Sequence, residues 1–309
     1  MATKIPAFSY TGQYRTEMRG GTWHIYFLSS GVLRFTYQKS ALEVFLVGGG
    51  GASGYHVGGG GGGGYTATHR GVVAAGNADI VVTIGAGGVG DANGRGNPGG
   101  ASSFGAYSVA GGQGGMSGYF NGDRRADGGS GGSGGGGSGA GNFPGGGHGG
   151  SDGGNGEAGP YGNGGAGQGS TTRAFGEPNG TLYAGGGGGG SWRPTADGGH
   201  GGGDGGAGGG AGGNENGVGF SAAANTGGGG GGGRSWAGGG NGGSGIVIIR
   251  SAEDDVIPVV FNGTQLQQIV FNGTKITGLI YNGMRIFARA MQRIARPFRR
   301  MATALCLTE

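Results

Sequence analysis

Glycine in this chain is concentrated between two short apolar segments, residues 44–47 (Val-Phe-Leu-Val) and residues 246–249 (Ile-Val-Ile-Ile). It makes up 96 of the 309 residues, a share that is typical of collagen or of a disordered linker. The apolar segments favour a third interpretation, because short runs of this kind form buried strands. We therefore expect a folded glycine-rich block whose two ends are tied into a sheet.

The sequence disfavours both collagen and a disordered linker. Collagen needs glycine at every third position and abundant proline, whereas the glycine runs at residues 58–64 and 227–233 break any triplet and the chain has only 8 prolines. A disordered linker has few aromatic and β-branched residues. Aromatic residues punctuate this block throughout, and a strand-like segment interrupts it at residues 80–84.

The remaining interpretation is a bundle of extended glycine helices of the polyproline-II type, called polyglycine II. Such a helix has three residues per turn and no internal hydrogen bonds, so its N–H and C=O groups must find partners on neighbouring segments. Without Cβ atoms, neighbouring helices can approach closely enough to bond directly. Because glycine loses more backbone entropy on ordering than any other residue, the bundle is stable only if many bonds form together.

The rest of the chain predicts a mainly β protein with four parts. Residues 1–47 form N-terminal strands, in which residues 23–28 and 32–37 are expected to be a hairpin joined at Ser29-Ser30-Gly31. Residues 48–250 form the glycine-rich domain, which the strand at residues 246–249 closes by returning beside the N-terminal strands.

Residues 251–287 contain three Asn-Gly hairpins that repeat every ten residues. Asn-Gly between β-forming residues is typical of a two-residue turn, so we expect Phe261 to lie opposite Thr264 and Val260 opposite Gln265. A lone hairpin is marginally stable in water. The three are therefore expected to pack on each other or on copies in other subunits.

Residues 288–309 form a basic tail with apolar residues at heptad spacing. Pro297 interrupts this pattern, which predicts one bent amphipathic helix or two short ones. The tail could dock on an acidic partner, hold a homo-oligomer together or cover the hairpins. We favour oligomer or partner docking over contact with a membrane. The candidate attachment residues in the hairpins and the tail are Phe261, Phe271, Tyr281, Met291, Ile294, Phe298 and Met301.

The sequence offers no catalytic, cofactor or metal site. Matches to G-x-G-x-x-G lack the βαβ unit that a dinucleotide fingerprint requires. His148 and His200 lie in glycine runs, where solvated loop histidines are the simpler interpretation than metal ligands. No Ser-His-Asp or paired-carboxylate constellation can be assembled, so we expect no enzyme activity.

Nucleic-acid binding, membrane insertion and disulfides are not expected either. The formal net charge is +4, with a single Arg-Gly-Gly at Arg19 and little of the basic and aromatic repetition of nucleic-acid binders. No stretch approaches the ~18 apolar residues of a membrane span. Cys306 is the one cysteine. The N-terminal residues lack a signal peptide, so we expect synthesis in a cytoplasm without ordinary export.

Several segments together resemble the glycine-rich domain of bacteriophage and prophage tail proteins. They are Phe-Ser-Tyr-Thr-Gly at residues 8–12, residues 21–28 and 30–35, Val-Phe-Leu-Val-Gly-Gly-Gly-Gly at residues 44–51, Val-Thr-Ile-Gly-Ala-Gly-Gly at residues 82–88, and residues 242–250. The resemblance covers residues 8–250. Short Asn-Gly-Thr hairpin arrays similar to residues 259–286 also occur at the ends of phage virion proteins.

The resemblance implies a virion structural protein of a tail fibre or tail tip that displays the glycine block for host attachment. Residues 251–309 would then bind other virion proteins and form a homo-oligomer, and the block would bind a host-surface glycan or protein. The candidate recognition residues are Tyr119, Phe120, Trp192, Arg193 and Trp236, which could equally anchor the bundle on the sheet. The alternatives are a head fibre, decoration or baseplate protein that binds no receptor, and then a bacterial glycine-rich surface protein.

Overall fold

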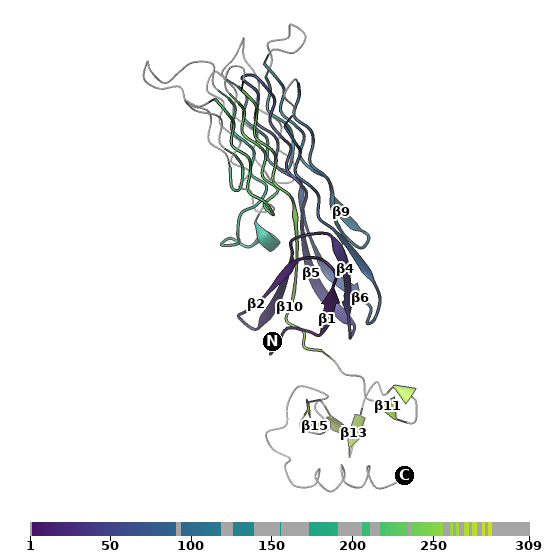
Figure 1. The fold of residues 1–309 in the computed structure, drawn as a ribbon. Helices are drawn as coiled ribbons and strands as arrows, with labels where there is room; N and C mark the ends of the chain where they lie inside the picture. Colours follow the sequence, from purple (N-terminus) through teal and green to yellow (C-terminus); the bar gives the residue numbers. More distant parts are fainter. Residues whose placement is uncertain are drawn as a thin grey trace. The chain divides into compact units, whose positions relative to one another are not determined.

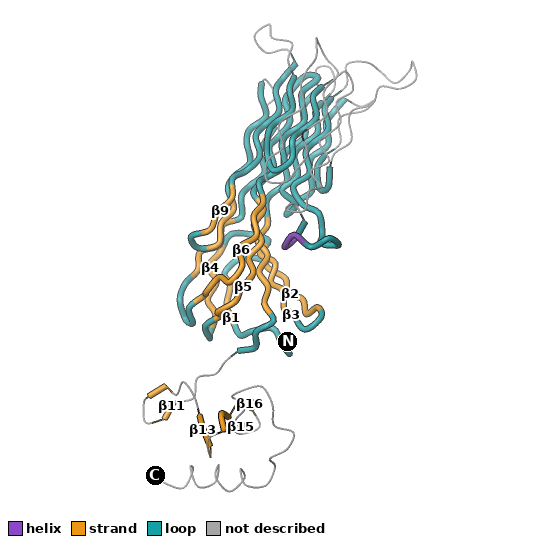
Figure 2. The backbone as a smooth tube through the Cα atoms, turned by 180° about the vertical axis from the view of Figure 1, so that it is seen from behind, coloured by secondary structure: helices purple, strands orange, loops and turns teal. Residues whose placement is uncertain are grey.

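The protein is described by a computed structural model that covers residues 2–90, 94–118, 126–138, 155, 173–190, 206–210, 217–233 and 237–255, and the backbone of six short strands between residues 260 and 285. Residues 1–253 form one compact unit and residues 254–309 a second. In the first unit, β-strands lie at one end and long glycine-rich segments run side by side from them (Figures 1 and 2). The described residues are mainly β and contain no α-helix.

The strands of the first unit form two antiparallel five-stranded sheets. Sheet A has the order β1-β4-β7-β8-β9, with β1 (Phe8–Tyr10), β4 (Gly31–Phe35), β7 (Ile80–Thr83), β8 (Ser102–Phe104) and β9 (Tyr107–Val109). Sheet B has the order β2-β3-β10-β5-β6, with β2 (Tyr14–Arg19), β3 (Thr22–Phe27), β10 (Ile246–Ser251), β5 (Lys39–Val47) and β6 (Thr66–Ala74). Four strands of the glycine-rich stretch therefore belong to these sheets in addition to β10.

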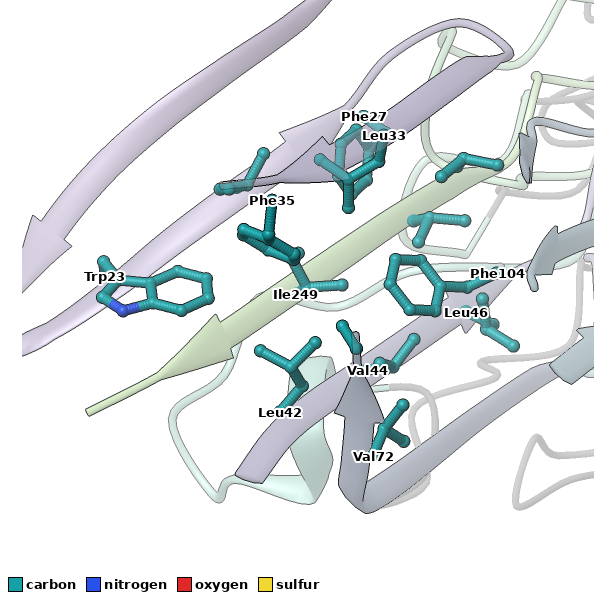
Figure 3. Close-up of a cluster of buried hydrophobic side chains, with 14 of the residues drawn as sticks. Trp23, Phe27, Leu33, Phe35, Leu42, Val44, Leu46, Val72, Phe104 and Ile249 are labelled. Carbon is teal, nitrogen blue, oxygen red and sulfur yellow. The ribbon is translucent and has the colours of Figure 1, made fainter. Parts of the chain in front are cut away.

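A hydrophobic core lies between the two sheets (Figure 3). Alternate residues of each strand point into it, as expected for sheets packed face to face. From sheet B come Trp23, Ile25, Phe27, Leu42, Val44, Leu46, Val72, Ala74, Val247 and Ile249, and from sheet A come Leu33, Phe35, Val82, Phe104 and Val109. The apolar alternation of the sequence thus becomes one shared core.

The expected hairpin between residues 23–28 and 32–37 is wrong. β3 pairs with β2 and β10 in sheet B, whereas β4 pairs with β1 and β7 in sheet A. The apolar faces of β3 and β4 cover each other across the core, which one hairpin in a single sheet could not achieve. The two-residue turn lies instead at Gly20-Gly21, where both φ angles are positive (57° and 74°), as a type I′ turn requires.

The strands at both ends of the glycine block pair with each other, which confirms the prediction from the sequence. Ile246 lies opposite Val47 and Ile249 opposite Val44 in the β10–β5 ladder. These strands are buried on both faces, because a segment of residues 173–184 covers the outer side of sheet B. There Phe175 and Tyr183 pack with Phe45, Val47, Ile246 and Ile248 in a second cluster. Burial on both faces explains why residues 44–47 and 246–249 are continuously apolar.

The glycine-rich segments bond to one another through their backbones with a three-residue period. The returning segment of residues 59–65 illustrates this: residues 59, 62 and 65 donate to the carbonyls of residues 116, 113 and 110, residues 60 and 63 to those of 136 and 133, and residues 61 and 64 to those of 230 and 227. Each N–H therefore reaches a different neighbour from the N–H groups on either side of it. One segment thereby joins three others that lie far away in the sequence.

The second unit contains three two-stranded ladders. They pair β11 (Val260–Phe261) with β12 (Thr264–Gln265), β13 (Ile269–Phe271) with β14 (Thr274–Ile276), and β15 (Ile280–Tyr281) with β16 (Met284–Arg285). Phe261 lies opposite Thr264 and Val260 opposite Gln265, the register expected for a two-residue turn. The predicted packing of the hairpins and the amphipathic tail at residues 288–309 lie outside the described residues.

Candidate binding end of the glycine-rich block

The glycine-rich block has one end that the chain reaches by extending β5. Residues 48–54 continue from β5, the chain reverses at residues 55–57, and residues 58–65 return to β6. His56 and Val57 make this reversal with positive φ angles of 50° and 49°, an uncommon conformation for residues with a side chain. The N–H of Gly54 donates to the carbonyl of Gly59 at 3.0 Å across the reversal.

Three other segments of the block meet the chain at this reversal. The N–H of Gly118 donates to His56 O at 3.1 Å, that of His56 to Ala237 O at 3.3 Å, and that of Gly190 to Gly58 O at 2.9 Å. His56 and Val57 are buried among them, with exposed fractions of 1% and 0%. We call this set of residues, 54–58 with 118, 190 and 237, the reversal end.

The five predicted recognition residues adjoin the reversal end in sequence. Gly118 immediately precedes Tyr119 and Phe120, Gly190 lies two residues before Trp192 and three before Arg193, and Ala237 immediately follows Trp236. All five recognition residues lie outside the described residues. What the structure brings together is the flanking positions of all three segments, a convergence that sequence spacing could not show.

Exposed apolar side chains on the described part of the block were not singled out from the sequence. Val218 and Phe220 are 59% and 54% exposed, and the intervening Gly219 donates its N–H to Gly238 O at 3.1 Å, one residue beyond the reversal end. Met116 is 38% exposed and accepts the N–H of Gly59. In sequence these residues look like interruptions of glycine, and only the backbone pairing places them beside this end.

A polar cavity of about 400 Å³ lies elsewhere, where the covering segment meets sheet B. It is lined by Thr22, Ala41, Glu43, Glu177, Arg250, Ser251, Ala252 and Glu253. Arg250 donates to Glu43 at 2.7 Å and to Glu177 at 2.6 Å, and its guanidinium lies 4.0 Å from the centre of the Phe175 ring. The charged groups hold one another, so we interpret this cluster as a clip that fixes the covering segment.

Glu253 closes the same region by accepting hydrogen bonds from the start of β5. Ser40 donates its hydroxyl at 2.6 Å and its N–H at 3.0 Å, and Ala41 donates its N–H at 3.3 Å. Burial alone would raise the pKa of Glu253, but these hydrogen bonds and the charge of Lys39 lower it overall. Its carbonyl also accepts the indole N–H of Trp23 at 2.8 Å, so Glu253 is part of the folded sandwich.

The described part of the chain contains no helix with the length and apolar character of a membrane span. Within the same part, no three His, Cys, Asp or Glu side chains gather in a way that could hold a metal ion. The attachment residues Phe261, Phe271 and Tyr281 lie in β11, β13 and β15. Met291, Ile294, Phe298 and Met301 lie outside the described residues, and the role of all seven stays a prediction.

Most of the first unit matches a family of known proteins. Residues 29–252 match a family described as a glycine-rich domain. The chain belongs to this family. The match begins just before β4 and ends just after β10, so it contains the glycine block and the strands from β4 to β10, whereas β1, β2 and β3 lie outside it. No curated protein matches the chain.

Proposed function

We propose that this glycine-rich domain protein is a structural protein of a bacteriophage virion, a tail-fibre or tail-tip adhesin. In this proposal the glycine block is a polyglycine-II bundle that carries host-binding loops, and residues 251–309 attach the chain to other virion proteins and to copies of itself. The protein would be made in the host cytoplasm and act in the virion. Its host ligand would be a surface glycan or protein.

The three-residue period of the backbone hydrogen bonds supports the polyglycine-II bundle. A helix with three residues per turn directs successive N–H groups to three different neighbours, and residues 59–65 donate in that order. Such a bundle is held by backbone bonds in every direction. It therefore suits a stiff module that displays loops far from its point of attachment.

The observation that carries the adhesin proposal is the convergence at the reversal end. Three stretches of sequence that contain aromatic or arginine residues adjoin Gly118, Gly190 and Ala237, which all bond to residues 56–58. Loops anchored on a rigid scaffold are a common place for binding residues, and aromatic residues and arginine contribute most to binding energy at interfaces. Several copies on one particle would add avidity to weak single sites.

Replacing the five recognition residues tests this proposal. The full chain with Tyr119→Ser, Phe120→Ser, Trp192→Ser, Arg193→Ser and Trp236→Ser should bind host cells at least about tenfold more weakly and no longer block phage adsorption. A matched variant on the sandwich, Val73→Ser, should behave like the wild type, since Val73 is 61% exposed on β6. Unchanged adsorption of virions that carry the five substitutions would refute the adhesin and favour the receptor-independent virion component.

Truncation after Glu253 tests the attachment role of the second unit. This end point retains the hydrogen bonds of Glu253 to β5 and Trp23, so the first unit should fold. The truncated chain is expected to be soluble but absent from purified particles. Normal incorporation into particles, measured by mass spectrometry of the virion, would contradict the assignment.

A further inference from the structure

β2 is the outermost strand of sheet B and has one open edge. It pairs with β3 along its whole length, and no described segment bonds to its other side. Five of its six residues are exposed and Glu17 is half-buried. Sheet B also ends at β6, but two register shifts in the β5–β6 ladder make that side irregular. A regular open strand is a ready template for pairing with another strand.

The turn between β2 and β3 determines which backbone groups face the open edge. Arg19 and Thr22 flank the two-residue turn at Gly20-Gly21, and such flanking residues form a hydrogen-bonded pair. Bonded and non-bonded pairs alternate along an antiparallel ladder. Arg15, Glu17 and Arg19 therefore bond to β3, while the N–H and C=O groups of Tyr14, Thr16 and Met18 point to the open edge.

Only one symmetric register of β2 against itself pairs all three outward-facing residues within the two strands and also opposes unlike charges. In a register centred on Arg15 or on Glu17, two like charges would lie directly opposite each other, which is destabilising. A register centred on Thr16 opposes Thr16 to Thr16, Tyr14 to Met18 and Arg15 to Glu17. All three outward-facing residues then form hydrogen-bonded pairs, and each Arg15 meets a Glu17 across the axis.

We propose that the open edge of β2 is a dimer interface, where a second copy of this chain adds its own β2 antiparallel in the register centred on Thr16. Sheet B would then continue across the two-fold axis as a ten-stranded sheet, twice the five strands of one chain. The occupant is a second copy because the charge pattern of β2 is complementary to itself. This inference does not depend on the proposed function.

The side chains at the open edge fit this partner on both faces of the sheet. Tyr14 and Met18 are 46% and 40% exposed, and an aromatic ring beside a thioether is a favourable contact. On the other face, the side chains of Arg15 and Glu17 are 54% and 41% exposed, and their charged groups lie 3.7 Å apart within one chain. Opposed residues of a non-bonded pair have Cα atoms about 4.5 Å apart, so a second copy brings opposite charges together.

The mass of the full chain in solution, measured by light scattering over a range of concentrations, tests the interface. Thr16→Pro removes an N–H from the centre of the open edge, where proline is tolerated in an outer strand. In the chain truncated after Glu253, where residues 254–309 cannot hold two copies together, it should halve the particle mass. Arg15→Glu should weaken dimerisation at least about tenfold, and the exchange Arg15→Glu with Glu17→Arg should restore it. Arg34→Glu, an equal charge change on sheet A, should leave the mass unchanged.

Cross-linking identifies the register directly. In a Cys306→Ser chain, Thr16→Cys places two thiols on the axis with Cα atoms about 5.5 Å apart, within the range of a disulfide. Oxidation should link this variant at low concentration, whereas Val73→Cys on β6 should stay unlinked. Equal linking of both variants, or a mass that neither Thr16→Pro nor Arg15→Glu changes, would overturn the proposal. A monomer with slowly exchanging amides at Tyr14, Thr16 and Met18 would also overturn it, since another part of the chain would then cover β2.

Discussion

Gly61 shows why the interior of the block must be glycine. Its N–H donates to Gly230 O at 2.8 Å, and its carbonyl accepts the N–H of Gly187 at 2.8 Å. A Cβ on Gly61 would collide with the carbonyl oxygen of Gly51, and a Cβ on Gly51 with that of Gln113. The neighbouring backbones occupy the space of a side chain, so the requirement comes from packing and not from a positive φ angle.

Gly61→Ala should therefore destabilise the fold strongly. Neither the substituted segment nor its neighbours can move without breaking backbone hydrogen bonds. We therefore expect the free energy of unfolding, measured by urea denaturation, to fall by about 1–3 kcal/mol or more. Gly238→Ala is the matched control, because a Cβ there meets nothing within 4 Å. It should change stability by less than about 0.5 kcal/mol, and equal losses in the two variants would contradict close packing.

Two buried histidines should make stability depend on pH. Burial lowers the pKa of His24, with a further contribution from the charge of Arg250, and burial lowers the pKa of His56. The ordinary value is 6.5, so the unfolded chain binds protons first as the pH falls. Stability is therefore fully present above pH 6.5 and is lost as the pH falls through the folded-state pKa values.

The His24→Phe variant isolates one of these contributions. The urea midpoint of the wild type should decrease between pH 7.5 and pH 5, and the decrease should be smaller in the variant. Phenylalanine keeps the ring that packs 6.2 Å from the Phe175 ring but cannot take up a proton. Identical pH profiles for the two proteins would show that His24 does not titrate differently on folding.

At the scale of elements, the covering segment is attached to sheet B by ion pairs as well as by its aromatic residues. Arg70 donates to the carbonyl of Phe175 at 2.8 Å and to Glu43 at 3.2 Å. Arg250 bridges Glu43 and Glu177 and is only 17% exposed. The 3-10 turn η2 (Ala174–Gly176) thereby holds Phe175 against β5.

Arg250→Ala should loosen this segment. Hydrogen bonds to charged groups contribute about 1.5–3 kcal/mol, and the variant loses those to Glu43 and Glu177 together with the contact to Phe175. We expect the free energy of unfolding, measured by thermal or urea denaturation, to fall by an amount of that order. Proteolysis near residues 173–184 should be faster. Arg34→Ala is the control, since its pair with Asp79 is more than half exposed and is worth about 0–1 kcal/mol. Similar losses in both variants would argue against the clip.

At the scale of the whole first unit, the two sheets and the glycine block share continuous chain. β5 and β6 run directly into residues 48–65, and β10 emerges from the block to pair with β5. Breaking the hydrogen bonds of the glycine block therefore frees the ends of the central strands. The sandwich and the block should unfold together.

Hydrogen exchange of the full chain measures this coupling. The amides of residues 59–65 donate to neighbouring segments and should exchange as slowly as those of β5 and β10. As urea is added, the amides of residues 59–65 should lose their protection from exchange in the same step in which the sandwich unfolds. Rapid exchange throughout the described glycine segments, with β5 and β10 still protected, would restore the disordered-linker interpretation.

Several features of the fold could be predicted because they depend on local chemistry. Continuous apolar residues at 44–47 and 246–249 indicated two buried strands that pair, and Asn-Gly gave the register of Phe261 with Thr264. The assignment of β3 and β4 to different sheets could not be predicted. The alternation of apolar residues shows which face of a strand is buried. It does not show whether the next strand along the chain pairs with it in the same sheet or packs against it from the other sheet.

Glycine content and apolar runs act residue by residue, so they were enough to predict a glycine-rich β protein whose block is bounded by paired strands. Which glycine segments are neighbours emerges only from the three-dimensional fold, because a glycine has no side chain to distinguish one partner from another. The fold also brings Gly118, Gly190 and Ala237 together at residues 56–58, and it leaves Tyr14, Thr16 and Met18 facing an open edge. Those relations arise from the path of the backbone, which the order of the residues alone does not display.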